Sequence, residues 1–295
     1  MNKTAKTILI IAICMLPIGV IATVLGISFG GRTGWRYEYG TGKGVVTSEA
    51  FSGSQKLDEF DSLDVEVRSA EVVIMRGDSF GIEYSTYKGK EPVITQENGK
   101  VTVKQPPTGF VMFEFGSHDL NTFTITVPEN SSEISLNVRS SSGDVTLDRI
   151  KVSGDVVSSS GDIMFNDIEG KEINATSSSG DINGDKVKVA KTRFESSSGD
   201  ISMLRVYADD LLAVSSSGDT GVYNSAITNV DCEASSGDVD IELNGKADDY
   251  SYDLKASSGD IVVNGVEVEK NYKEDGGNNS IIAKTSSGDV NVSIK

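Results

Sequence analysis

Cysteine, histidine and positive charge are scarce in this sequence, and each shortage excludes a class of function. The 295 residues contain 27 Lys and Arg against 44 Asp and Glu, which gives a net charge of −17. Nucleic-acid binding needs clustered basic residues, so the composition argues against it. Cys14 and Cys232 are too few for a disulfide framework or a four-ligand zinc site. The one histidine, His118, has no identifiable catalytic partner, and the sequence contains no phosphate-binding loop or metal-ligand motif, so we predict no cofactor.

Charge is missing altogether from residues 8–30, which read ILIIAICMLPIGVIATVLGISFG. A helix of this length spans about 35 Å, enough to cross the hydrocarbon core of a bilayer. The sequence therefore predicts a transmembrane helix over 8–30, after a short tail at 1–7 and before a juxtamembrane linker at 31–56. A cleaved signal peptide is the alternative, although its apolar region is usually only about 7–15 residues long.

The charges beside this segment do not fix its orientation, because basic residues lie on both sides of it. Lys3 and Lys6 precede the segment, whereas Arg32, Arg36 and Lys43 follow it. We expect a single-pass protein of the cell membrane with its N-terminus inside and its large domain extracytoplasmic.

The tripeptide Ser-Gly-Asp recurs through the second half of the chain. Successive regular copies are 18, 19, 19, 19, 19, 22 and 29 residues apart. A near-constant period in this range is typical of solenoids and other repeat architectures. A further copy, Ser153-Gly154-Asp155, is out of phase and is predicted to be a chance turn. The eight regular copies are Ser142-Gly143-Asp144, Ser160-Gly161-Asp162, Ser179-Gly180-Asp181, Ser198-Gly199-Asp200, Ser217-Gly218-Asp219, Ser236-Gly237-Asp238, Ser258-Gly259-Asp260 and Ser287-Gly288-Asp289.

Except at Thr220 and Gly184, apolar residues occupy the positions five residues before each repeat glycine and two and four residues after it, with mostly polar residues between them. This alternation predicts half-buried strands on both sides of the tripeptide, and glycine supplies backbone freedom for a bend between them. Cys232 stands at one of the apolar positions and is predicted to be a packed thiol. Stacked units would share one narrow core. We therefore predict an all-β fold, a single-chain β-solenoid over residues 136–295, in the form of a right-handed β-helix with about 19 residues per rung.

Residues 57–135 are rich in strand patterns but lack the regular repeat. Ser69-Ala70-Glu71 stands near a corner position. Terminal units of solenoids are atypical because they must cover exposed strand edges, so this region is predicted to form irregular rungs and an N-terminal cap. The longer intervals at 246–252 and 269–280 are predicted to be surface loops.

The aspartate that ends each tripeptide allows two interpretations. Aspartate is a favoured turn residue because its side chain hydrogen-bonds nearby backbone, which makes the column architectural. The alternative is a ladder that binds Ca²⁺ or another hard cation through carboxylate oxygens. That alternative would use Asp144, Asp162, Asp181, Asp200, Asp219 and Asp238.

An N-terminal anchor followed by Ser-Ser-Gly-Asp repeats resembles the bacterial putative-adhesin family of Ser-Gly-Asp β-strand repeat proteins, which is defined largely by a domain of unknown function. The resemblance covers about residues 57–295 and is carried by Ser140-Ser-Ser-Gly-Asp-Val145, Ser177-Ser-Ser-Gly-Asp-Ile182 and Ser196-Ser-Ser-Gly-Asp-Ile201. Similar membrane-anchored members accompany cell-envelope stress-response systems of Gram-positive bacteria. The resemblance implies a β-helix, an extracytoplasmic location and adhesion or envelope sensing, and it supplies no catalytic residues.

Three hypotheses for function follow from the sequence. The first is a non-enzymatic, membrane-anchored module that binds an envelope polymer or a protein partner. The second is a polysaccharide-active β-helix enzyme, which would need clustered carboxylates in place of a uniform column. The third is a scaffold that assembles by end-to-end stacking of solenoids.

Overall fold

The computed structural model describes residues 34–39, 44–48, 50–106, 110–115 and 121–295. The predicted anchor at 8–30, with Cys14, lies outside these residues, as does His118. Among the described residues, no helix is long and apolar enough to cross a membrane. The chain divides into a small unit and a large unit, and the large unit holds Ser52–Thr86, Lys90–Pro107 and Asn121–Lys295.

The small unit contains an antiparallel sheet in the order β2-β1-β9. Its strands are β1 (Gly34–Tyr39), β2 (Gly44–Ser48) and β9 (Phe110–Phe115). Strands β1 and β2, followed by β3 (Ala50–Lys56), thus lie within the segment predicted to be a linker. The alternation of aromatic and charged residues from Trp35 to Tyr39 is a strand pattern, which accounts for this difference.

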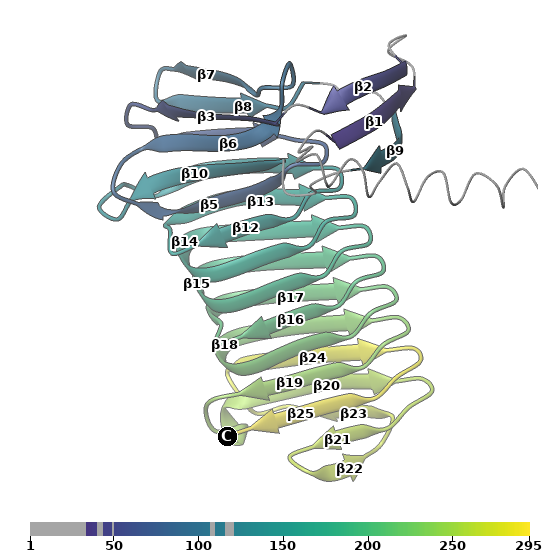
Figure 1. The fold of residues 1–295 in the computed structure, drawn as a ribbon. Coiled ribbons are helices and arrows are strands. Elements are labelled where there is room, and N and C mark those ends of the chain that lie inside the picture. The colour runs from purple at the N-terminus through teal and green to yellow at the C-terminus, as the bar shows by residue number, and fades with distance from the viewer. Residues whose placement is uncertain (1–33, 40–43, 49, 107–109, 116–120) are drawn as a thin grey trace, which may run out of the picture. The chain divides into compact units, whose positions relative to one another are not determined.

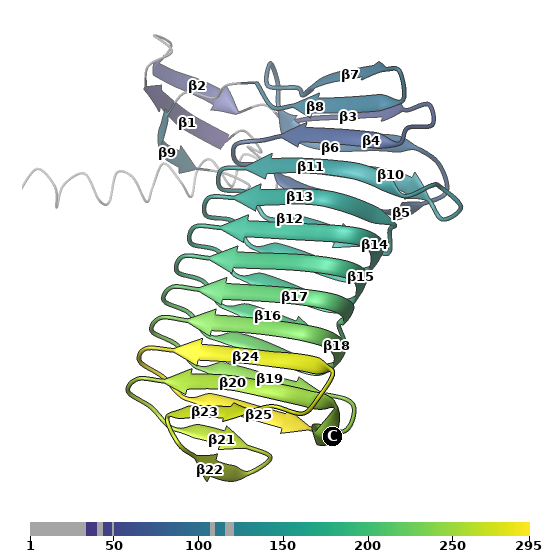
Figure 2. The same ribbon diagram turned by 180° about the vertical axis from the view of Figure 1, so that it is seen from behind.

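The large unit is a stack of rungs, each paired in parallel with the next (Figures 1 and 2). In the regular part, β14 pairs with β15 from Ile163↔Ile182 to Ser177↔Ser196, an offset of one 19-residue repeat. The all-β solenoid is therefore confirmed, while the hand of its coil stays a prediction. The strands of the regular part are β11 (Ile134–Ser140), β12 (Val145–Asp148), β13 (Val152–Ser158), β14 (Ile163–Ser177), β15 (Ile182–Ser196), β16 (Ile201–Leu204), β17 (Tyr207–Ser215), β18 (Thr220–Ala234) and β19 (Val239–Leu243).

The predicted apolar positions form the core of the stack. The residues five places before the repeat glycines are all at most 1% exposed, from Val138 to Ala283. Cys232 is among them, as predicted, and is fully buried. The out-of-phase Gly154 is not a turn: it lies inside β13, paired with Leu136 and Ile173, so that prediction is wrong. A Cβ at this position would lie 1.9 Å from the Leu136 carbonyl oxygen, so close packing of the backbone requires the glycine.

Each regular rung also turns at a second corner, six residues after its glycine. There, the backbone adopts the left-handed conformation at non-glycine residues, with φ between 49° and 57°. These residues are Arg149, Asp167, Lys186, Arg205 and Asn224. The left-handed conformation is uncommon for such residues, so the change of direction at this corner has a small cost in conformational free energy.

The N-terminal end of the large unit is built from irregular strands. Strands β4 (Ser62–Glu66) and β5 (Glu71–Gly77) continue the parallel pairing onto β11 and β12, and β8 (Lys100–Lys104) and β10 (Thr122–Pro128) extend it further. Antiparallel pairing then ends the stack: β7 (Val93–Glu97) lies on β8, and β6 (Gly81–Tyr87) lies on β10, with β3 beyond it. Ala70 stacks against Gly143, so Ser69-Ala70-Glu71 is a corner, as predicted.

The C-terminal end does not follow sequence order. Strands β24 (Asn279–Thr285) and β25 (Val290–Ile294) form a rung that lies between β18–β19 and β20–β21, where β20 is Tyr250–Ala256 and β21 is Ile261–Val263 (Figure 2). The antiparallel strands β22 (Val266–Val268) and β23 (Asn271–Glu274) pair with β21 and β20. A 3-10 turn at Ala247–Asp249 precedes β20. The segments predicted to be surface loops thus contain the first residues of β20 and β24 and the whole of β23, which the sequence did not reveal.

Candidate functional site

The aspartate column forms a hydrogen-bonded ladder along one corner of the stack. The backbone N–H of Asp162 donates to Oδ1 of Asp144 at 2.9 Å, and the N–H of Asp181 donates to Oδ1 of Asp162 at 2.8 Å. The pattern continues at 2.8–2.9 Å through Asp200, Asp219, Asp238, Asp289 and Asp260, in the spatial order of the rungs. Each carboxylate from Asp144 to Asp289 therefore satisfies a backbone donor of the neighbouring corner.

These contacts favour the architectural interpretation of the aspartates. One oxygen of each laddered carboxylate up to Asp289 is already used by the backbone. Across the described ranges, no group of three or more His, Cys, Asp or Glu residues is arranged to hold a metal ion. The aspartate column is therefore a structural feature of the corners.

The corner glycines serve close packing rather than backbone freedom. None of the eight has a positive φ, which corrects the sequence-based explanation. A Cβ on Gly199 would lie 2.2 Å from the carbonyl oxygen of Gly180 in the preceding rung. Glycine is required because successive corners stack backbone on backbone.

At five of the eight corners a buried serine lies three residues before the glycine, a position that sequence reasoning missed, and at the other three corners Ala234, Ala256 or Thr285 stands there. These serines are buried, and their Oγ atoms accept the glycine N–H at 2.9–3.0 Å. They are Ser140, Ser158, Ser177, Ser196 and Ser215. The predicted corner serines directly before the glycines, such as Ser179 and Ser198, are exposed. The first serine of each Ser-Ser-Ser-Gly-Asp run was the available signal.

Cys232 has no chemical role in this arrangement. Burial raises the pKa of its thiol, and the neighbouring Asp231 carboxylate adds to the shift. A thiol that stays protonated is a poor nucleophile. The structure thus supports its interpretation as a packing residue.

A groove of about 800 Å³ runs along the stack on the side that follows the second corner of each rung. We call it the axial groove. One side is lined by a column of residues eight positions after each glycine, which pair in register from rung to rung: Lys151, Glu169, Lys188, Tyr207 and Ala226. The other lining residues are Glu133, Gly170, Lys171, Val189, Ala190, Ala208, Asp209, Ile227, Thr228, Tyr250 and Asn279.

Small residues are prominent among those that line the groove. Gly170 has no room for a side chain, because its Cβ would lie 1.9 Å from the Val152 carbonyl oxygen. Alanines at three further lining positions leave space above the backbone. Tyr250 also lines the groove, and its hydroxyl donates to the carbonyl oxygen of Ile227 at 2.9 Å. The groove is therefore a depression that crosses several rungs.

The ionic side chains of the axial groove are only loosely paired. Lys188 lies 3.9 Å from Glu169, and Lys171 lies 3.8 Å from Glu133. The Lys171 side chain is 85% exposed and that of Lys188 is 70% exposed. Ion pairs that are this exposed to solvent contribute little to stability. These ammonium groups can therefore leave their carboxylates for a ligand with little loss of free energy.

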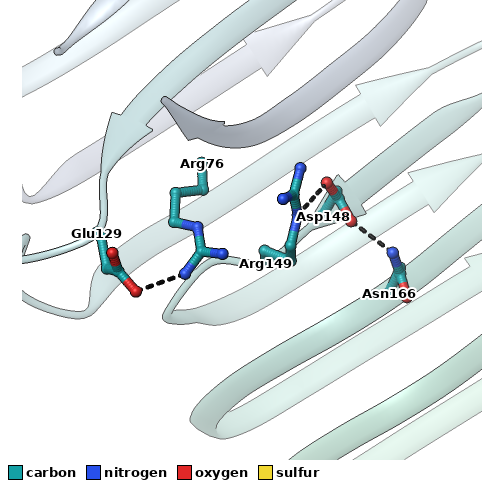
Figure 3. A network of polar contacts seen from close by, with 5 residues as sticks. All are labelled: Arg76, Glu129, Asp148, Arg149 and Asn166. Atoms are coloured by element: carbon teal, nitrogen blue, oxygen red, sulfur yellow. Dashed lines mark hydrogen bonds and ion pairs between the residues drawn. The ribbon is translucent and has the colours of Figure 1, made fainter. Parts of the chain in front are cut away.

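A second, smaller cavity of about 190 Å³ shares Lys151 and Glu169 with the axial groove and is lined by Arg76 and Arg149 as well. Figure 3 shows the two arginines there. Arg76 pairs with Glu129 at 2.6 Å, and Nε of Arg149 donates to Asp148 at 2.8 Å. Asp148 also accepts a hydrogen bond from Asn166. Basic side chains therefore continue beyond the N-terminal end of the axial groove.

Comparisons with known proteins bear on the fold. A family model described as Toastrack DUF4097 matches residues 60–293. The solved structure of a putative adhesin from Parabacteroides merdae is similar at 12% identity and a TM-score of 0.50, over 84% of this chain and 96% of that one. A putative adhesin from Bacteroides fragilis has 14% identity and a TM-score of 0.49, over 84% and 97% of the two chains. A putative lipid binding protein from Parabacteroides distasonis has 11% identity and a TM-score of 0.44, also over 84% and 97%. A search of curated proteins finds no match.

Proposed function

The chain belongs to the Toastrack DUF4097 family, and on this premise we propose that it is a non-enzymatic binding module of the cell surface. In this proposal, residues 8–30 anchor the chain in the membrane, and the solenoid lies on the extracytoplasmic side. Its axial groove takes an extended ligand from the cell envelope, and the regular corners hold the groove rigid.

The observation that carries this proposal is the axial groove itself. It crosses successive rungs, and its column from Lys151 to Ala226 changes in chemistry from one rung to the next. A surface of this kind suits recognition of an elongated ligand. The laddered aspartates, the most regular carboxylates of the chain, are used as backbone acceptors, which leaves them poorly placed for acid–base catalysis. The similar Parabacteroides merdae protein is described as a putative adhesin, which fits a binding role.

Co-sedimentation of the full chain, purified in detergent, with cell envelopes tests the proposal. Ala190 lines the groove and is exposed, so A190W should fill the groove and abolish saturable binding. Thr176 is exposed on β14 and does not line the groove, so T176W is the matched control and should bind like wild type. Absence of binding by the wild type, or equal loss in both variants, would refute the proposal.

The proposed topology has a separate test. Protease added to intact cells should digest the solenoid while the N-terminal segment stays with the membrane. A solenoid that is protected until the cells are lysed would contradict the extracytoplasmic location.

A further inference from the structure

We propose that the axial groove binds an anionic polysaccharide, with the polymer chain laid along the solenoid axis. This inference rests on the proposed function and names the class of ligand. It depends on three observations: the distribution of charge beside the groove, the loose pairing of its lysines, and an exposed aromatic residue in its lining.

Charge beside the groove is opposite in sign to that of the whole chain. The rungs that begin at Gly143, Gly161, Gly180 and Gly199 each place two exposed side chains at or beside the groove. These side chains are six and eight residues after the glycine. From the N-terminal end, the pairs are Arg149 with Lys151, Asp167 with Glu169, Lys186 with Lys188, and Arg205 with Tyr207. These positions hold five basic and two acidic residues, and the remaining charged residues that line the groove are Lys171, Glu133 and Asp209. Together they carry six basic and four acidic residues, whereas the chain as a whole has 27 basic and 44 acidic. A local positive surface on an acidic protein attracts polyanions selectively to this site.

The basic pairs are spaced along the axis rather than gathered at one point. Parallel strands lie about 4.8 Å apart, so the Arg149–Lys151 pair and the Lys186–Lys188 pair are about 10 Å apart. The acidic pair lies on the rung between them. A ligand lying across the stack would meet one rung, whereas a polymer lying along the axis meets each basic pair in turn. The axial direction of the groove therefore favours a linear polymer.

The lysines of the groove are available to a ligand. Within the part of the chain that the structure describes, Lys188 has a loose 3.9 Å contact with Glu169, and both side chains are more than half exposed. Arg205 is engaged more firmly, because its Nε donates to Asp185 at 2.7 Å, which lowers the pKa of the Asp185 carboxyl. Lys188, with Lys151 on the same column and Lys171 beside it, is therefore placed to pair with ligand anions.

Tyr207 adds an apolar contact within the charged surface. Its side chain is 49% exposed and lies next to Lys188 in the column, with Ala208 and Ile227 also lining the groove. An aromatic ring with one open face packs well against the apolar face of a sugar ring. Acidic polysaccharides alternate anionic groups with the apolar faces of sugar rings. A polyanion without such rings would have nothing to pack against Tyr207.

Binding of defined polymers to the full chain in detergent tests this inference. The probes are polygalacturonate, dextran sulfate and neutral dextran, with phosphatidylglycerol vesicles as the lipid arm. We expect both acidic polymers to bind in a salt-dependent manner and neutral dextran to fail. Because two exposed charge contacts are lost, K151Q/K188Q should weaken binding about tenfold. The Y207A variant should weaken binding while leaving its salt dependence unchanged.

The control variant K255Q/K270Q removes the same charge at exposed lysines that do not line the groove, and it should bind like wild type. Equal loss in both double variants would overturn the inference, as would equal binding of neutral dextran. Vesicle binding that depends on Lys151 and Lys188, without polymer binding, would replace the polysaccharide with a lipid surface. If envelopes bind but neither acidic polymer does, the ligand class alone is wrong; if envelopes also fail to bind, the proposed function falls with it.

Discussion

Replacing Asp181 by Asn and by Ala separates the architectural and cation-binding interpretations of the aspartate ladder. Oδ1 of Asp181 accepts the N–H of Asp200 at 2.8 Å, and the N–H of Asp181 donates to Asp162 at 2.8 Å. Asparagine keeps an oxygen at Oδ1 and removes the charge. Alanine removes both. If the side chain serves as a backbone acceptor, the two substitutions should therefore have different effects.

The rung spacing sets the electrostatic part of the D181N effect, and the lost hydrogen bond sets the D181A effect. A carboxylate about 4.8 Å from each of two like charges in water loses up to about 1 kcal/mol per neighbour, and salt screens much of this repulsion. The amide also makes a weaker hydrogen bond than the carboxylate. We expect D181N to change the free energy of unfolding by less than about 1 kcal/mol. D181N should be most stable relative to wild type at low salt, because the repulsion that it removes is largest there. We expect D181A to lower the free energy of unfolding by about 1–2 kcal/mol through the lost hydrogen bond.

Urea unfolding of the full chain, followed by far-UV circular dichroism, measures these changes at low and high salt. The series should be repeated with calcium. If D181N is as destabilising as D181A, the acceptor explanation is refuted. If calcium stabilises the wild type and neither variant, the ladder is a cation site and the architectural interpretation is wrong.

Further predictions concern the core, the corners and the inserted rung, and the same unfolding assay checks each. Thr220 buries a hydroxyl that has no hydrogen-bond partner among the described residues, so T220V should raise stability by about 1 kcal/mol. The matched variant T192V should lower it by about 1 kcal/mol, because the Thr192 hydroxyl donates to a backbone carbonyl at 2.7 Å. G199A should lower the free energy of unfolding by about 3 kcal/mol, because the new Cβ would lie 2.2 Å from a carbonyl oxygen of the preceding rung. Deleting residues 279–295 removes a rung from inside the stack, so it should lower the urea midpoint more than any of these substitutions. An unchanged midpoint in the deletion, or a less stable T220V, would contradict these assignments.

The regular part of the solenoid could be predicted because its signal is repeated in every rung. The position two residues after the glycine is apolar in seven of eight copies, and the structure buries all eight. Even the exception, Thr220, is fully buried. Periodicity of this kind reports burial directly, because strand side chains alternate between the core and solvent.

The order of the last rungs could not be predicted, because the aspartate contacts between neighbouring corners are the same whichever copies meet. Asp289 accepts the N–H of Asp260 and donates its own N–H to Asp238, the same contacts that join consecutive repeats elsewhere. The aspartate contacts therefore carry no information about which copies meet. The interval of 29 residues signals an insertion without revealing that the chain passes one rung position and returns to fill it.

The second corner and the axial groove escaped sequence analysis for a related reason. The corner residues from Arg149 to Asn224 share a backbone conformation and no side-chain chemistry, so no column stands out in an alignment of the repeats. The groove column from Lys151 to Ala226 varies in the same way. The two halves of the rung thus obey different constraints: one half has serine, glycine and aspartate fixed by backbone contacts with the next corner, and the other half is free to vary. Because the regular positions serve the fold, the proposed recognition depends on positions where the repeats differ, and the column from Lys151 to Ala226 in the axial groove is one such set.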